Sequence, residues 1–245
     1  MDSVVITRVA ERHWHALADD RVVGRGEASP RPDGRLFVSV DSWQGAVFDQ
    51  LANAMLANLP TPLYTVVDEA DRDLVDHWRR AGFATRRREW EYVVPTEVDP
   101  VPAPSGVTIL GVGDAEETRL RAVDRAIRGE VDWLTMPAEV LSRPDGDTVL
   151  FPSRYAVAAL GGRYVGMARV ATLTRQPRIG VLAVLAEQRG HGIGRALLAN
   201  VLRSLHGNGF AIASAEVHES NEAAVALFEG IGARRGASNL ELVWG

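Results

Sequence analysis

The stretch IGVLAVLAEQRGHGIGRALL, residues 179–198, combines three local patterns that decide the fold of the C-terminal half. Its apolar beginning, Ile179–Val184, predicts a strand, and glycines at positions 190, 192 and 194 follow. From Gly194 onward the apolar residues recur at helical spacing, so the glycine-rich turn opens directly into a helix. The stretch therefore predicts a strand, a turn and a helix N-terminus.

Such a turn is suited to an anion. Glycine accepts positive φ and has no Cβ, so neighbouring N–H groups can converge, and the helix adds unpaired N–H groups and the positive end of its dipole. A Rossmann site is disfavoured because the spacing is G-x-G-x-G rather than G-x-G-x-x-G. A P-loop is excluded because the sequence has no Gly-Lys-Ser/Thr run. A pyrophosphate fits the loop best.

The two halves of the chain repeat one pattern at an offset of about 150 residues. Each begins with a predicted β-hairpin, turning at residues 19–20 in the first half and 161–162 in the second. A strand and an amphipathic helix follow, at 36–40 and 45–59 in the first half and at 179–184 and 194–205 in the second. Both halves are predicted to be mixed α/β sheets, two copies of one fold.

Between the halves lies a stretch that can form neither a helix nor a central strand. Prolines occupy positions 95, 100, 102 and 104, followed by Ser105 and Gly106. The expected organisation is a first domain at 1–94, a linker at 95–106 and a second domain at 107–245.

At this point the residues resemble a known family. The segment VLAEQRGHGIGRA, 184–196, resembles motif A of the GCN5-related N-acetyltransferases (GNAT), whose pattern is Q/R-x-x-G-x-G/A. The run from Val217 to Phe228 that closes in Gly232–Ala233 resembles motif B of the same family. Together the matches span roughly residues 155–235. The repeat then resembles a tandem arrangement of two acyl-CoA N-acyltransferase-like domains.

The resemblance implies acetyl-CoA as the donor and a set of residues that hold it. Asn221 would lie beside the pantetheine arm or the thiol, and Phe228 would pack against the pantetheine. The arm itself would pair with the strand end at Leu182, Ala183 and Val184. The pyrophosphate would be bound by the loop residues Arg189, Gly190, His191, Gly192, Ile193, Gly194 and Arg195.

No residue is an obvious general base, because the strand at 178–184 contains no acid. Four candidates remain: Glu216 and His218, which alternate to one face of their strand, and Glu130 and Asp132, in the segment expected to border the acceptor cleft. Each has a plainer interpretation as a solvated acid or a polar strand end. Phe228 stands where the family often has a tyrosine, so the leaving thiolate would depart unassisted or through water.

The first copy lacks the anion-binding loop. Only residues 41–44 separate its strand from Gly45, whereas the second copy has 185–194. Asp71 and Trp78 stand where the second copy has Asn221 and Phe228. The first copy is therefore predicted to be a degenerate partner that retains the fold and supports the second.

The sequence thus predicts an acetyl-CoA-dependent N-acetyltransferase that acylates a primary amine of a small molecule or peptide by direct attack in a ternary complex. The alternative is a non-catalytic acyl-CoA-binding or regulatory module, as a monomer or homodimer in either case. A net charge of −5 disfavours nucleic acid, and no apolar run or signal-like start suggests a membrane, so we expect a cytoplasmic location. With zero cysteines and six scattered histidines, no disulfide or metal site is predicted.

Overall fold

The computed structural model describes residues 4–31, 34–130, 150–171 and 176–245. The chain divides into two compact units: unit 1 consists of Met1–Glu89 with Ala237–Gly245, and unit 2 of Trp90–Gly236. Two strands, β6 (Ala84–Pro95) and β12 (Arg234–Trp244), contribute residues to both units. Each unit is an α/β structure built on a mixed sheet.

Unit 1 places its strands in the order β1-β2-β3-β4-β5-β12-β6. The parallel pair is β4–β5, while the pairs from β1 to β4 and the β5–β12 pair are antiparallel. The helices supply Val47, Phe48, Leu51 and Trp78 to a core on this sheet. The elements are β1 (Val5–Ala10), β2 (His13–Ala18), β3 (Arg21–Pro30), β4 (Leu36–Ser42), α1 (Gly45–Leu56), β5 (Leu63–Asp68) and α2 (Arg72–Arg80).

Unit 2 continues with the strand order β12-β6-β11-β10-β9-β8-β7. Its strands are β7 (Val107–Leu110), β8 (Tyr155–Leu160), β9 (Arg163–Ala171), β10 (Arg178–Val184) and β11 (Ile212–His218). Its α-helices are α3 (Glu117–Glu130), α4 (Ile193–Gly207) and α5 (Glu222–Glu229). Two short 3-10 helices, η2 (Pro152–Arg154) and η3 (Ala186–Gln188), precede β8 and α4.

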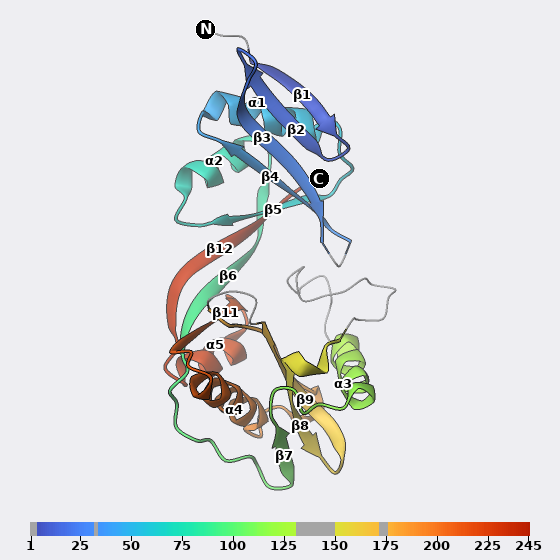
Figure 1. Cartoon of the computed structure of the whole chain (residues 1–245), viewed down its shortest axis with the longest axis vertical. Helices are drawn as coiled ribbons and strands as arrows, with labels where there is room; N and C mark the ends of the chain where they lie inside the picture. The colour runs from blue at the N-terminus through green and yellow to red at the C-terminus, as the bar shows by residue number, and fades with distance from the viewer. Residues whose placement is uncertain (1–3, 32–33, 131–149, 172–175) are drawn as a thin grey trace. The chain divides into compact units, whose positions relative to one another are not determined.

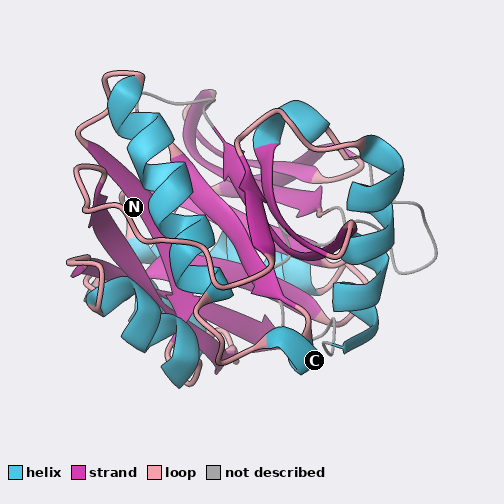
Figure 2. Ribbon diagram, turned by 90° about the horizontal axis from the view of Figure 1, so that it is seen from below, coloured by secondary structure: helices cyan, strands magenta, loops and turns pink. Residues whose placement is uncertain are grey.

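The sheet of unit 2 is covered on both faces. Ala156 and Ala168 pack in one cluster with α4 and α5, whereas their neighbours Val157 and Met167 pack in another with α3. Successive strand residues point to opposite faces, so α3 lies on one face and α4 and α5 on the other (Figure 1). Figure 2 shows helices flanking the strands in a view from below.

The predicted hairpins are confirmed, because both form two-residue turns between antiparallel strands. Asp19 and Asp20 have φ of 47° and 57°, and Gly161 and Gly162 have φ of 56° and 80°. Positive φ at both central residues is the type I′ pattern that matches the right-handed twist of paired strands. Glycine reaches it without strain, whereas aspartate is among the few other residues that tolerate it.

The later part of the repeat also holds in three dimensions. Asp71 and Asn221 are the N-cap residues of α2 and α5, and their side chains accept the backbone N–H of Leu74 and Ala224 at 3.1 Å. Gly82 and Gly232, after the two helices, have φ of 96° and 90°. The two halves therefore share a local backbone as well as a sequence pattern.

The division of the chain differs from the contiguous domains expected at 1–94 and 107–245. In the sheet order, β12 lies between β5 and β6, and β6 lies beside β11. The last strand of each half is therefore next to a strand of the other half. Residues 96–106 have no helix or strand, as the prolines predict, but they belong to unit 2 rather than separating the units. Alternation along a strand fixes which face it buries but not which strand it pairs with.

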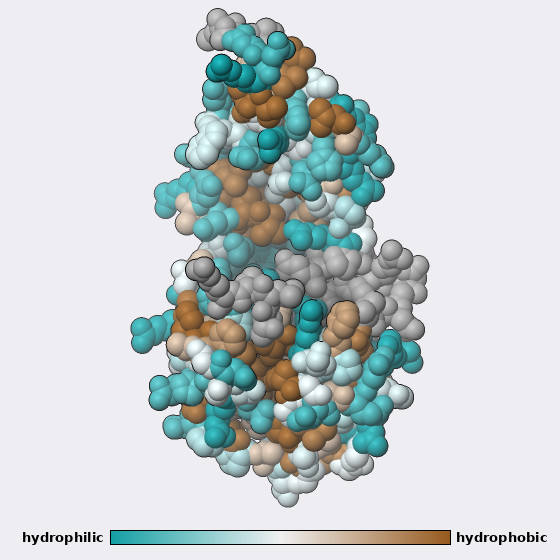
Figure 3. All heavy atoms as spheres, in the orientation of Figure 1, coloured by the Kyte–Doolittle hydropathy of each residue, from teal (hydrophilic) through white to brown (hydrophobic). Residues whose placement is uncertain are grey.

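Hydrophilic side chains cover much of the visible face of each unit, with smaller apolar areas between them (Figure 3). Among the described residues, no helix has both the length and the apolar character needed to cross a bilayer.

Candidate functional site

The candidate site begins at a fork between two parallel strands. β10 pairs with β11 only at Arg178–Ser214 and Ile179–Ala215, whereas on its other side it pairs with β9 as far as Val184–Gly166. Within the described residues, the edge of β10 that faces β11 therefore has open backbone groups beyond Ile179. The three strand residues predicted to lie along a pantetheine arm are at this edge: Leu182, Ala183 and Val184.

The open edge leads into the glycine-rich loop. Gly190 and Gly192 have φ of 79° and 81°, in the left-handed region that favours glycine. Gly192 is the N-cap of α4, and no side chain caps this helix. Residues 189–192 are exposed, whereas Ile193 is buried and anchors the first turn. The N–H groups of the first turn of α4, from Ile193 to Arg195, are therefore presented at an exposed, left-handed turn.

The third glycine has a different role from the one expected. Gly194 lies inside α4 and has no positive φ. A Cβ at this position would be 3.8 Å from both Leu227 and Val184, which is ordinary van der Waals contact. Of the three glycines, two are thus required by backbone conformation, and the third leaves space beside the end of β10.

Glu130, one of the predicted bases, contacts the loop. Its Oε2 accepts the backbone N–H of Ala186 at 2.9 Å and an Nη2–H of Arg189 at 3.0 Å. Arg189 in turn donates from Nε to the carbonyl oxygen of Val184 at 2.9 Å. The two side chains thus tie α3, the end of β10 and the start of the loop together. Glu130 as a base stays a prediction, and the contacts favour a positioning role.

We expect Glu130→Gln to weaken acetyl-CoA binding by about 3- to 10-fold, because a neutral side chain loses the charge-assisted bond to Arg189. Isothermal titration of the coenzyme measures this. Glu187→Gln is the matched control, because it removes the same charge from the same loop, where Glu187 pairs with Arg163 and both side chains are at least 60% exposed. Equal affinities in the two variants would contradict the positioning role. A loss of turnover with unchanged affinity would instead favour Glu130 as the base.

The two candidates on β11 lie on one face of the strand, as predicted. Ala213, Ala215 and Val217 are buried in the core, whereas Glu216 and His218 are partly exposed on the other face. Glu216 accepts a hydrogen bond from Arg178 at 2.5 Å. The fourth candidate, Asp132, lies outside the described residues.

The hydrogen bonds of His218 fix its tautomer. The backbone N–H of Ser220 points at His218 Nδ1 over 3.1 Å, and the Ser220 hydroxyl is 2.7 Å from the same atom. A backbone N–H can only donate, so Nδ1 is the acceptor and the neutral ring carries its proton on Nε2. Because Nδ1 already accepts this hydrogen bond, it is not available to take a proton from an amine.

Asn221 and Phe228 both have structural partners. The side-chain oxygen of Asn221 is used in the α5 cap, as its counterpart Asp71 is in α2. Phe228 is 4% exposed, and its ring stacks on Tyr92 with 5.8 Å between centroids. Contact of either residue with a coenzyme stays a prediction.

Tyr92 was missed in the sequence because it belongs to β6, the last strand of the first half. Its hydroxyl donates to Glu229 at 3.0 Å and accepts from Arg235 Nε at 3.1 Å. Burial raises the pKa of Tyr92, against the lowering effect of Arg235. No sequence signal indicated that this strand would reach the second copy's core.

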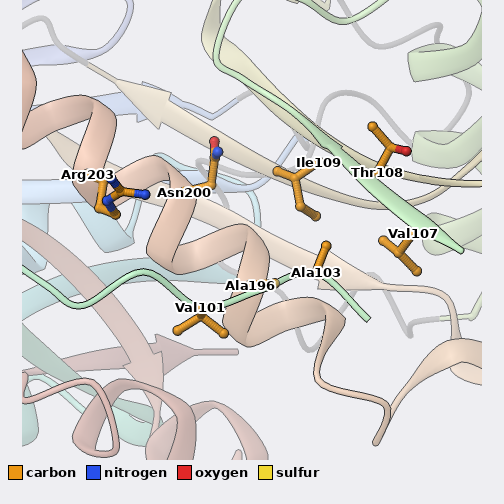
Figure 4. A pocket seen from close by; sticks show the side chains of 8 residues that line it. All are labelled: Val101, Ala103, Val107, Thr108, Ile109, Ala196, Asn200 and Arg203. Atoms are coloured by element: carbon orange, nitrogen blue, oxygen red, sulfur yellow. The ribbon is translucent and has the colours of Figure 1, made fainter. Parts of the chain in front are cut away.

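A separate hollow of about 360 Å³ lies between the linker, β7 and α4 (Figure 4). Thr108, Asn200 and Arg203 give it polar groups, and the remaining lining is apolar. It contains no acid or histidine for proton transfer, and the fork residues Leu182, Ala183 and Val184 do not line it.

Comparison with known proteins connects this geometry to a family. Residues 127–233 match the acetyltransferase (GNAT) family. A curated relative, the mycothiol acetyltransferase of Acidimicrobium ferrooxidans, is 27% identical over 209 residues. The match covers 80% of this chain and 66% of that relative, just under two thirds of its length.

Solved structures show the fold over nearly the whole chain. A GCN5-related N-acetyltransferase from Sphaerobacter thermophilus superposes with a TM-score of 0.74 at 16% identity, covering 97% of this chain and 82% of that one. A tandem GNAT protein from the clavulanic acid biosynthesis pathway gives 0.66 at 16% identity, covering 95% and 82%. The expected tandem acyltransferase fold is confirmed.

Proposed function

Because residues 127–233 form a domain of the GNAT acetyltransferase family, we propose that the chain is an acetyl-CoA-dependent N-acetyltransferase acting on a primary amine of a small molecule or peptide. The similarity to a mycothiol acetyltransferase supports an acetyl-transfer activity. Acetyl-CoA supplies the acyl group as an activated thioester.

One observation carries the proposal: the open edge of β10 runs directly into the uncapped N-terminus of α4. Open strand groups suit an extended amide-containing arm, and the N–H groups from Arg189 to Arg195 suit a pyrophosphate. The residues present fit the coenzyme, because Gly190 and Gly192 are exposed and a Cβ at either would meet no atom closer than 3.9 Å. The loop therefore leaves space for the phosphates.

The reaction requires a C–N bond to form between the amine and the thioester carbonyl carbon while the C–S bond breaks. The backbone N–H near Val184 would donate to the thioester carbonyl oxygen, and the bond from Arg189 to the Val184 carbonyl holds the adjacent peptide in place. Of the two β11 candidates, Glu216 is favoured to accept the amine proton, because Nδ1 of His218 already accepts the Ser220 N–H. Phe228 has no proton to give, so this position would supply no acid to the departing thiolate, which would leave unassisted or through water.

Phe228 also motivates a second candidate function. A family position that often carries a tyrosine here holds a buried phenyl ring, and the hydroxyl of the neighbouring Tyr92 already bonds to Glu229 and Arg235. A non-catalytic acyl-CoA-binding module would show the same coenzyme contacts without turnover.

An acceptor screen separates these functions. The full chain is mixed with acetyl-CoA and a panel of primary amines, including amino acids, peptides, amino sugars and polyamines, and free thiol is measured against a Gly192→Glu background. We expect at least one amine to release thiol well above that background. Thermal stabilisation by acetyl-CoA without thiol release from any amine would favour the binding module. No stabilisation at all would overturn both.

A further inference from the structure

A cluster of polar side chains lies on the face of the unit 2 sheet that α3 covers. Tyr155 on β8 and Arg169 on β9 are paired in register and therefore share this face. The sheet-facing side of α3 adds Asp124, which is 4% exposed, and Arg128. Tyr155 packs in one cluster with Val123 and Ile127 of α3, so the polar residues on this side of the helix face the same region of the sheet.

The guanidinium of Arg169 lies flat over β10. A Cβ added to Gly180 would be 3.0 Å from Nη2 and 3.3 Å from Nε of Arg169. Gly180 falls at the irregularity in β9–β10 pairing between Ile179 and Val181. An alanine Cβ at position 180 would be in tight contact with the guanidinium, which would have to shift by a few tenths of an ångström, so the glycine leaves room for this placement.

Arg169 is the cation of this face that lacks an anionic partner among the described residues. Its Nε is buried without a hydrogen-bond acceptor. The acids on either side are already engaged: Asp124 accepts from Arg128 Nε at 2.8 Å, and Glu216 accepts from Arg178 at 2.5 Å. Arg169 is half-buried, and a charge in such a place is costly unless it is paired, so the described residues leave its positive charge without a balancing anion.

Tyr155 adds a neutral donor to this charge. It is 5% exposed, and burial raises its pKa while the nearby Arg169 lowers it. The phenol therefore keeps its proton at neutral pH and can donate to an oxyanion beside Arg169.

The position of Arg169 relates it to the fork. It pairs in register with Val181, the residue at which β10 has separated from β11. The guanidinium itself lies over Gly180, four residues before Val184, about 13 Å at the usual rise per residue. A group held at Arg169 therefore lies within the length of an extended amino acid or a short peptide from the end of β10.

We propose that Arg169, with Tyr155, binds a carboxylate of the acceptor, so that the acceptor is a primary amine that also carries a carboxyl group, such as an amino acid or short peptide. This inference rests on the proposed function and deepens it. A planar guanidinium matches the two oxygens of a carboxylate, and the unbalanced charge selects an anion over a neutral or cationic amine.

The test compares ligands that differ only in the carboxyl group. N-acetyl-amino acids and their primary amides are titrated into the full chain in the presence of coenzyme A, and thermal stabilisation is measured. We expect the acids to bind about 10- to 100-fold more tightly than the amides, and Arg169→Met to abolish this difference. Gly180→Ala should reduce the preference for acids over amides by displacing the guanidinium. Arg169→Lys should retain part of this preference.

This readout is independent of turnover. Coenzyme A alone should stabilise the wild type, Arg169→Met and Gly180→Ala equally, and a variant that fails this control would not have retained its fold, in which case Arg169→Lys carries the comparison. Equal binding of acids and amides to the wild type would overturn the carboxylate site while leaving the acyltransferase standing. Preferential binding of acids without thiol release from the free amines would overturn the acyltransferase but not the site.

Discussion

Gly192→Glu is expected to weaken acetyl-CoA binding by at least about 100-fold. Gly192 has φ of 81° and caps α4, so any side chain there is strained by about 1–2 kcal/mol. A glutamate also brings a negative charge to the N–H groups proposed to hold the pyrophosphate. Two like charges about 4 Å apart near a protein surface repel by about 4 kcal/mol. The loss of affinity is measured by isothermal titration or by the thermal shift at fixed coenzyme concentration.

The control for this variant is Gly209→Glu, at the other end of the same helix. Gly209 has φ of 86°, is exposed, and would present its Cβ to open space. The substitution imposes the same strain and the same charge, about 25 Å from the loop at the usual helical rise. Gly209→Glu should lose at least as much stability as Gly192→Glu, because a negative charge is unfavourable at a helix C-terminus, and only Gly192→Glu should lose the coenzyme. Retained binding in both would place the pyrophosphate elsewhere.

Local geometry was predictable where a residue type has one dominant conformational use. Gly190 and Gly192 adopt the left-handed backbone that the loop required, and Gly161–Gly162 and Asp19–Asp20 form their hairpin turns. Alignment of the two halves matched Asp71 with Asn221, and both residues are helix N-caps. In each case the conformation is set within a few residues, so it leaves a trace in the local sequence.

Pairing between strands that are far apart in the sequence was not predictable, because it is not set within a few residues. The pattern of a strand indicates which of its faces is buried but not which strand it pairs with, so the sequences of β6 and β12 do not identify their neighbours. The consequences of the pairing, such as the stacking of Tyr92 on Phe228, were hidden with it.

In the candidate site, too, local features were predictable and long-range contacts were not. The loop and the fork were expected, but the partners of the acids were not, because a carboxylate carries no sign of what it contacts. Glu130 bonds to Arg189, which is 59 residues away in the sequence, and Glu216 bonds to Arg178, which is 38 away. The sequence did not single out Arg169, because what distinguishes it is that the described residues supply no counterion to it.

Glu241→Ala is expected to cost unit 1 about 3–5 kcal/mol of stability. Glu241 lies on β12 beside Val66 of β5 and is 7% exposed. Arg35 donates to its Oε1 at 3.1 Å, and Arg86 bonds to the same oxygen. Removing one partner of a buried ion pair leaves the other charge without this compensation, and that is the more damaging change. Urea unfolding, with the slope compared between variants, measures the loss.

Two further variants separate the buried pair from charge removal in general. Asp76→Ala breaks the exposed pair with Arg79 in the same unit, where both side chains are more than half exposed, and should cost less than about 1 kcal/mol. Arg35→Met combined with Glu241→Met should be more stable than Glu241→Met alone, because it leaves no charge of this pair buried. If Glu241→Ala shifted the urea midpoint no more than Asp76→Ala, the buried pair would not hold β12 in unit 1, and the apolar residues Leu240 and Leu242, at 2% and 0% exposure, would have to do so.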